Sequence, residues 1–233
     1  MFGNMTIRGK LALGFALMLI IVSVVAYFGI FYITRINNEN HYAQNYVLFR
    51  YNTLQVLELE VFGMRHVVAM MALNVGNEHV LTEIWNDFTQ LHNRTKSILS
   101  VYHHSLLRDP RMTSETQEDA IRFATLMDTR IMQYIAEVIE PMFLVAMVDP
   151  NNEAEIERLL ALGIYVYASI NSVIVGLSYA TYETLYEINI SINDLSSTAI
   201  LVIMNVTIIG IVIGIFIVLF ISKNITKSIL LQE

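Results

Sequence analysis

The residues with the clearest chemical potential are an arginine and the aromatic residues expected to lie level with it. Arg65 can hold a carboxylate through two parallel N–H···O bonds, and His66, Tyr165 and Tyr167 could supply further contacts. These residues meet if the helices that carry them run antiparallel, because that register sets Arg65 level with Tyr165. The alternative for Arg65 is a solvated or salt-bridged surface arginine.

A second arginine occupies an apolar register. Arg50 stands between Val47 and Leu54 in a helical pattern, and a buried guanidinium needs a partner. The same register sets it level with Tyr179 and Tyr182, which could offer a cation–π contact or a hydroxyl. A structural role or a snorkelling position is favoured over ligand binding for this residue.

Histidine is the other residue type that could carry chemistry. No Glu-x-x-His occurs, so a di-iron carboxylate site is not expected, and the adjacent His103 and His104 point to different faces of a helix. With no cysteine, thiolate metal sites and covalent haem are excluded. We therefore expect no catalytic residue, metal or cofactor and no enzyme activity. A bundle that holds haem through Met64 or His66 is the alternative.

The composition places part of the chain in lipid. Only 15% of the 233 residues are charged, against about 25% in soluble domains, and 55% are hydrophobic. Leu11–Ile33 and Ala199–Ser222 lack any charge, and each is longer than the ~20 residues that cross a bilayer. Twenty of the 21 acidic residues and ten of the 14 basic ones lie between these segments. This negative segment argues against nucleic-acid binding.

The remaining basic residues orient the spans. Arg8 and Lys10 precede the first span, and Lys223 and Lys227 follow the second, which predicts both termini in the cytoplasm. The expected domains are a cytoplasmic N-terminus (1–10), a first transmembrane helix (11–34), an extracytoplasmic domain (35–197), a second transmembrane helix (198–222) and a cytoplasmic linker (223–233). The expected location is the inner membrane.

The second span contains a possible packing motif. Gly210 and Gly214 form a GxxxG, and Asn205 could hydrogen-bond between helices. One interpretation is that this span packs closely against a neighbour. The other is that glycine is simply frequent in such helices.

Three breaks divide the outer segment into four long helices. They fall at residues 74–77, 109–111 and 149–152, and short links make neighbouring helices antiparallel. Apolar residues three and four apart predict a seam along each helix, with Asp128 inside the third seam and Pro141 as a kink. Ser114 and Gln117 read as a capping box, and Asn151 or Asn152 as a later cap. The expected fold is all-α, an up-down-up-down four-helix bundle whose helices 1 and 4 continue into the spans.

The first helix of this bundle carries a second apolar stripe. Tyr42, Tyr46, Phe49, Thr53 and Val56 lie beside its seam. Homodimerisation through this helix, and with it the fourth, is the preferred interpretation. A thick bundle core is the alternative.

Both ends of the chain resemble one receptor family. Met5–Phe15, MTIRGKLALGF, is similar to the opening of methyl-accepting chemotaxis receptors, and Ile221–Ile229, ISKNITKSI, resembles the entry to a HAMP signal-relay domain. Ser228 stands where the family usually has proline. The resemblance implies an outer bundle that binds a small ligand at a dimer interface, or a periplasmic binding protein, and displaces the fourth helix. Arginines of the outer first helix serve this purpose in relatives that read amino acids, and Arg65 lies at a comparable height.

The resemblance leaves the output open. The chain is expected to be a sensing portion without its own signalling module, which the family places downstream. The same bundle also precedes histidine kinases and diguanylate cyclases. A scaffold for partner proteins, without sensing, is a further alternative.

Overall fold

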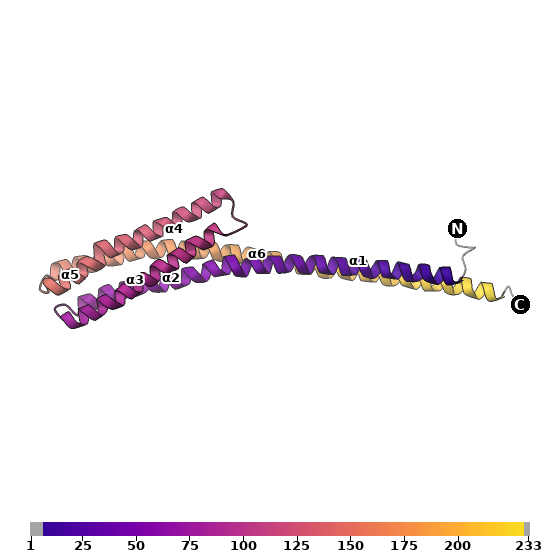
Figure 1. The fold of residues 1–233 in the computed structure, drawn as a ribbon, viewed down its shortest axis with the longest axis horizontal. Helices are drawn as coiled ribbons and strands as arrows, with labels where there is room; N and C mark the ends of the chain where they lie inside the picture. The colour runs from indigo at the N-terminus through magenta and orange to yellow at the C-terminus, as the bar shows by residue number, and fades with distance from the viewer. Residues whose placement is uncertain (1–6, 231–233) are drawn as a thin grey trace. The chain divides into compact units, whose positions relative to one another are not determined.

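Every regular element of the described chain is a helix. In this computed structural model, which describes residues 7–230, no strand occurs (Figure 1). The elements are α1 (Ile7–Tyr42), η1 (Ala43–Leu48), α2 (Phe49–Leu73), α3 (Glu78–Leu107), α4 (Ser114–Tyr134), η2 (Ile135–Ile139), α5 (Glu140–Val148) and α6 (Glu153–Leu230), where η denotes a π-helical turn. The expected all-α class is confirmed. Most of the predicted N-terminus, with Met5 and Thr6 of its motif, and the last three residues of the linker lie outside the described residues.

The chain divides into two compact units. Residues 43–186 form one, here called the core unit, and residues 1–42 with 187–233 form the other, here called the long-helix unit. Helix α6 belongs to both units, because it runs for 78 residues without interruption.

The predicted breaks coincide with the turns of the core unit. At Gly76 the backbone φ is +76°, a conformation that favours glycine, and its N–H donates to the carbonyl of Ala146 at 2.9 Å. Asn77 then caps α3 by accepting from the N–H of Val80 at 3.3 Å. This hydrogen bond from Gly76 ties the first turn to α5.

The predicted capping box is wrong by one residue. Thr113 caps α4, because its hydroxyl accepts from the N–H of Thr116 at 3.3 Å. Gln117 does not close a box with Ser114. Its side-chain amide donates to the carbonyl of Leu106 at 2.9 Å, and this carbonyl at the end of α3 also accepts from the N–H of Asp109 at 3.4 Å. Asn152 caps α6 as expected, accepting from the N–H of Glu155 at 3.2 Å.

The irregularity expected at Pro141 takes the form of a π-helical turn. Proline has no N–H and its ring clashes with the carbonyl four residues earlier. The widened turn η2 precedes it directly, and the N–H of Glu140 donates to the carbonyl of Ile135. An extra residue in the turn gives the ring room without ending the helix. The similar turn η1 contains no proline, and nothing in its sequence predicts it.

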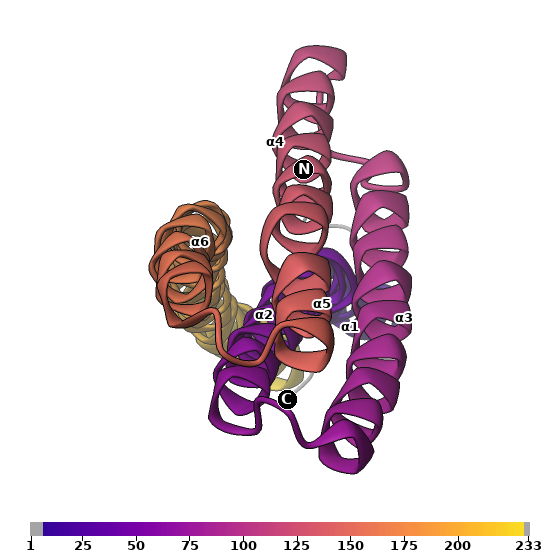
Figure 2. The ribbon, with the colours of Figure 1, turned by 90° about the vertical axis from the view of Figure 1, so that its left-hand side faces the viewer.

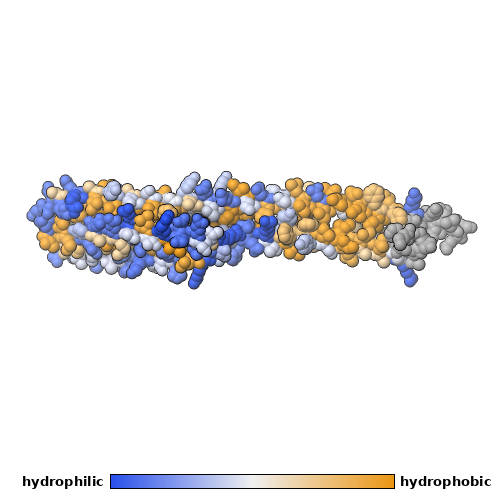
Figure 3. All heavy atoms as spheres, turned by 90° about the horizontal axis from the view of Figure 1, so that it is seen from above, coloured by the Kyte–Doolittle hydropathy of each residue, from blue (hydrophilic) through white to orange (hydrophobic). Residues whose placement is uncertain are grey.

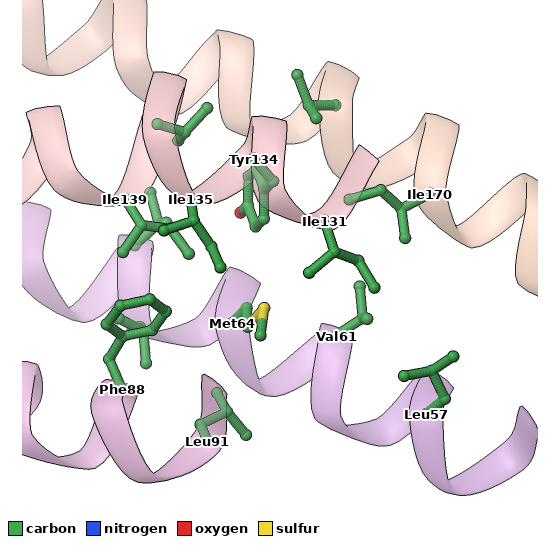
Figure 4. Packing of buried hydrophobic residues seen from close by; sticks show 14 of the residues in the cluster. Leu57, Val61, Met64, Phe88, Leu91, Ile131, Tyr134, Ile135, Ile139 and Ile170 are labelled. Atoms are coloured by element: carbon green, nitrogen blue, oxygen red, sulfur yellow. The ribbon is translucent and has the colours of Figure 1, made fainter. Parts of the chain in front are cut away.

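One apolar cluster fills the core unit. Helix α2 packs on α3 and α5, and α3 packs on α4 and α5 (Figure 2). Five residues of the first part of α6 join this cluster: Ile156, Leu159, Val166, Ile170 and Ile174. Figure 4 shows Met64 and Val61 of α2 facing Tyr134 and Ile131 of α4. The seam predicted for α2 is buried along most of its length, from Leu54 to Met71.

Asp128 was wrongly included in the seam of α4. Its side chain is exposed, whereas Met127 and Tyr134 are fully buried. The helix therefore presents a slightly rotated face to the core. Since burying a carboxylate without a partner costs several kcal/mol, this rotation removes a charge that the predicted seam would have buried.

In the long-helix unit, α1 and α6 approach closely at the GxxxG motif. A Cβ added to Gly210 would lie 2.6 Å from Cγ2 of Ile21, and one added to Gly214 would lie 3.4 Å from the thioether of Met18. Both glycines are buried. The interpretation that this span packs closely against a neighbour is consistent with these contacts, and here the neighbour is α1 of the same chain.

Within residues 7–230, three helical stretches are long and apolar enough to cross a membrane. They lie in Leu11–Leu73, Ser114–Val148 and Glu153–Phe220. In the first and third, only 6% and 11% of the most apolar window is buried, compared with 39% in Ser114–Val148. Figure 3 shows hydrophobic side chains dominating the surface beside the grey terminal residues, where α1 and the end of α6 lie. The candidate in Ser114–Val148 was not predicted from the sequence, and it uses much of its apolar surface inside the protein.

Replacing Gly210 tests the close approach of α1 and α6. We expect Gly210→Leu to separate the helices, because the new side chain would overlap Ile21. With cysteines introduced at Met18 and Gly214, oxidation should form an intrachain disulfide in membranes, and G210L should reduce its yield several-fold. Gly29→Leu is the matched control, since nothing lies within 4 Å of a Cβ at Gly29. Equal disulfide yields in both variants would contradict the contact.

Candidate functional site

Arg65 lies against an aromatic ring in the core unit. Its guanidinium carbon sits 5.0 Å from the centre of the Tyr167 ring, a cation–π distance. The sequence had set Arg65 level with Tyr165, so the predicted register holds to within two residues. Stacking on a ring occupies the face of the guanidinium and leaves the N–H groups at its edge free to bind a carboxylate.

A buried hydroxyl lies beside this pair. Tyr134 is fully buried, and its hydroxyl finds no hydrogen-bond partner among the described residues. A Cβ added to Gly163 of α6 would lie 3.7 Å from that oxygen. Burial raises the pKa of Tyr134, and the nearby positive charge of Arg65 opposes the rise. Residues from α2, α4 and α6 thus converge at one place, here called the Arg65 cluster (Arg65, Tyr134 and Tyr167).

The other residues predicted around Arg65 do not join it. Tyr165 is 74% exposed, whereas Val166 and Ile170 of the same helix are buried. His66 is exposed and follows Arg65 by one residue, which turns it about 100° around α2. Their ligand-binding roles stay predictions.

Arg50 is paired with a residue that the sequence reasoning missed. It is 4% exposed, and its guanidinium lies 2.6 Å from the carboxylate of Asp109. The sulfur of Met112 accepts from the same nitrogen at 3.7 Å. The carboxylate also accepts from the N–H of Arg111 at 2.9 Å, so the α3–α4 loop is fixed onto α2.

The tyrosines suggested as possible partners of Arg50 are exposed, whereas Arg50 is buried and paired with Asp109. Tyr179 and Tyr182 are 69% and 52% exposed, and the ring of Tyr182 lies 6.1 Å from that of Tyr51 instead. The register of the helices predicts which residues of α6 lie level with Arg50. It does not predict the path of the α3–α4 loop, which brings Asp109 to Arg50. The signal available was the acid itself, since Asp109 opens a predicted break and a buried arginine requires an anion.

A tyrosine next to this ion pair is also strongly buried. Tyr102 is 2% exposed, and burial raises its pKa to about 12, although the charge of Arg50 favours the ionised form. Its phenol therefore stays neutral at physiological pH. The apolar surroundings of the Arg50–Asp109 pair keep water away from it.

The surface of the core unit carries cavities, among them the following two. One, of about 470 Å³, lies between η1 and the end of α3 and is lined by Tyr46, Phe49, His104 and Arg108 among others. The other, of about 620 Å³, lies between α3 and α4. Within residues 7–230, no group of three or more histidines or carboxylates is arranged to hold a metal ion. Met64 is fully buried while His66 is exposed, so these two residues do not face one cavity.

The chain was compared with known protein families, sequences and structures. No protein-family model matches the chain, and no curated protein sequence or solved structure matches it significantly.

Removing Asp109 should be costly for stability. In Asp109→Ala, the guanidinium of Arg50 stays buried without an anion, which typically costs about 3–5 kcal/mol. We expect a large fall in the melting temperature, measured by circular dichroism of the chain in detergent. Glu60→Gln is the control, because it breaks an ion pair with the exposed Arg94 and should cost about 1 kcal/mol or less.

Replacing both Arg50 and Asp109 by apolar residues tests whether the stability lost in Asp109→Ala comes from an unpaired charge or from lost packing. The double variant Arg50→Met/Asp109→Leu should melt well above Asp109→Ala, since no unpaired charge remains. If Asp109→Ala and Glu60→Gln have the same melting temperature, the buried ion pair does not fix the α3–α4 loop.

Proposed function

We propose that this chain is the sensing and membrane-crossing part of a transmembrane chemoreceptor. The observation that carries the proposal is α6, which supplies core residues up to Ile174 and continues without a break through the apolar segment ending near Phe220. A rigid helix shared by a ligand-binding core and a membrane span can carry a displacement from one to the other. The resemblance of both chain ends to methyl-accepting chemotaxis receptors supports the same function.

The proposed topology has two spans around an outer bundle. The segments α2, α3, α4–α5 and the first part of α6 would form an up-down-up-down four-helix bundle outside the cytoplasm, which their short connecting turns support. Ser114–Val148 is assigned to this bundle and not to the membrane, because it shares its buried face with α2 and α3. The basic residues at both chain ends support the proposal that the termini lie in the cytoplasm, and the proposed location is the inner membrane.

The Arg65 cluster is the proposed place for the ligand. The guanidinium of Arg65 offers several N–H donors and is stacked on the Tyr167 ring. Tyr134 contributes a buried hydroxyl without a hydrogen-bond partner among the described residues. Leaving that hydroxyl unpaired costs about 1–3 kcal/mol, which a ligand that bonded to it would recover. The class of ligand that suits this geometry is a small carboxylate. Arg50 is assigned a structural role, since its charge is already paired.

A second copy of the chain is the proposed partner of α2. Phe49 and Val56 of the predicted stripe are 44% and 45% exposed, and Leu59 and Phe62 beside them are 70% and 55% exposed. Tyr42, in contrast, is already buried within a single chain, where only 9% of its surface is exposed. We therefore place the dimer contact along Phe49 to Phe62 and not at Tyr42.

A chimera tests the sensory function. Joining residues 1–230 to the cytoplasmic signalling module of a chemoreceptor should give cells whose kinase output responds to a small carboxylate found by screening. Arg65→Gln should weaken this response at least tenfold, because a charge-assisted bidentate contact is lost. Arg94→Gln, which removes an exposed arginine of α3, should leave it unchanged.

Locking α1 to α6 provides the complementary measurement. A disulfide between cysteines at Met18 and Gly214 should suppress the response, and a reductant should restore it. A response that survives the lock would rule out sliding of α6 against α1. Absence of any response in the chimera, with normal membrane insertion, would overturn the sensory proposal.

A further inference from the structure

The α3–α4 cavity has the size and lining of a small-molecule site. Its volume is about 620 Å³, within the roughly 300–1,000 Å³ of typical ligand pockets. Thr95 and Leu99 of α3 and Ala124 and Ile131 of α4 line it, and all four are buried. The cavity therefore reaches the edge of the apolar core and is more than a shallow surface groove.

Two opposite charges line this cavity from its two sides. Lys96 belongs to α3 and Asp128 to α4. Within the described part of the chain, neither side chain forms an ion pair or a hydrogen bond, and they are not paired with each other. Asp128 is also the acid that interrupts the apolar spacing of its helix. Both charges are thus available to a bound molecule.

Histidines extend the polar rim on the α3 side. His92, His103 and His104 all line the cavity. Nδ1 of His104 lies 3.2 Å from the carbonyl of Ser100, which can only accept, so this nitrogen carries the proton. Nε2 of the neutral ring is then an acceptor. Because no group of three such residues is arranged for a metal in the described chain, an organic ligand suits this rim better than an ion.

We propose that this cavity binds a small zwitterion whose ammonium and carboxylate groups are separated by an apolar spacer. The carboxylate would face Lys96, the ammonium would face Asp128, and the spacer would cover Leu99 and Ile131. A ligand with a single charge would leave one of the two protein charges without a partner. The site is separate from the Arg65 cluster, and it stands whether or not the chain is a chemoreceptor.

Calorimetry of the full chain in lipid nanodiscs tests this proposal with three probes that share a six-carbon chain. These are 6-aminohexanoate, hexanoate and hexylamine. Each partly exposed charge pair contributes up to about 1 kcal/mol, or roughly fivefold in affinity. We therefore expect 6-aminohexanoate to bind roughly fivefold more tightly than either singly charged probe. Equal affinities for all three, or no heat with any of them at millimolar concentration, would overturn the proposal.

Single variants test which protein charge binds which group of the zwitterion. Lys96→Met should abolish the advantage of 6-aminohexanoate over hexylamine, and Asp128→Asn should abolish its advantage over hexanoate. Asp87→Asn, an exposed acid elsewhere on α3, should change nothing. Arg65→Gln should also bind the zwitterion normally, which separates this site from the proposed sensory one.

An exchange of the two charges guards against indirect effects. In Lys96→Asp/Asp128→Lys, the ligand can bind in the reverse direction, so the preference for the zwitterion should return. Circular dichroism melting of every variant verifies that it is folded. If folded single variants keep the preference, or the exchange fails to restore it, the two residues do not hold the ligand.

Discussion

One helix of this protein presents two different kinds of surface along its length, and much of the structure depends on this difference. In its first part, α6 buries one face, including Ile170 and Ile174, against the other helices of the core unit. In its last part, it is apolar on nearly every side and exposes many large hydrophobic side chains, a pattern compatible with a helix in lipid. A continuous helix pairs its backbone groups internally throughout, so the change of surroundings needs no change of backbone structure. No glycine or proline occurs between Leu177 and Ala199 to absorb a bend.

The polar residues that interrupt the core have distinct consequences. The Arg50–Asp109 pair fixes a loop to α2 and gives the packing a specific register, at a desolvation cost that only a paired charge can offset. Tyr134 keeps an unpaired hydroxyl beside Arg65. Asp128 is turned out of the core and reaches a cavity. Apolar burial stabilises the fold, whereas these three exceptions mark the places where it is specialised.

Helix content and most of the core could be predicted from the sequence. Spacing alone identified Leu54, Val61 and Met71 as buried, and the turn at Gly76 followed from the break residues around it. The approach of Arg65 to α6 was predicted to within two residues, because antiparallel helices with short links leave little freedom of register.

What sequence reasoning missed depends on three-dimensional detail. Asp109 reaches Arg50 through a loop whose path no periodicity encodes. The π-helical turns add a residue to the helical repeat, which rotates the following face and places Ile139 and Ala146 in the core. Ser114–Val148 was not recognised from the sequence as a possible membrane span. Its most apolar 18-residue stretch has a mean hydropathy of 1.6, below the 2.6 and 2.9 of the other two candidates. Composition cannot separate a core helix from a lipid-exposed one, and only burial by neighbours does so.

The most direct test of the proposed two-span topology is to measure which helices contact lipid. A fluorophore attached to single cysteines at Ile209 of α6 and at Leu144 of α5 can be exposed to nitroxide-labelled lipids or to aqueous iodide in nanodiscs; both positions are more than half exposed. We expect quenching by lipid at Ile209 and by iodide at Leu144. Quenching by lipid at Leu144 would place Ser114–Val148 in the membrane and contradict a two-span receptor with an outer helical bundle.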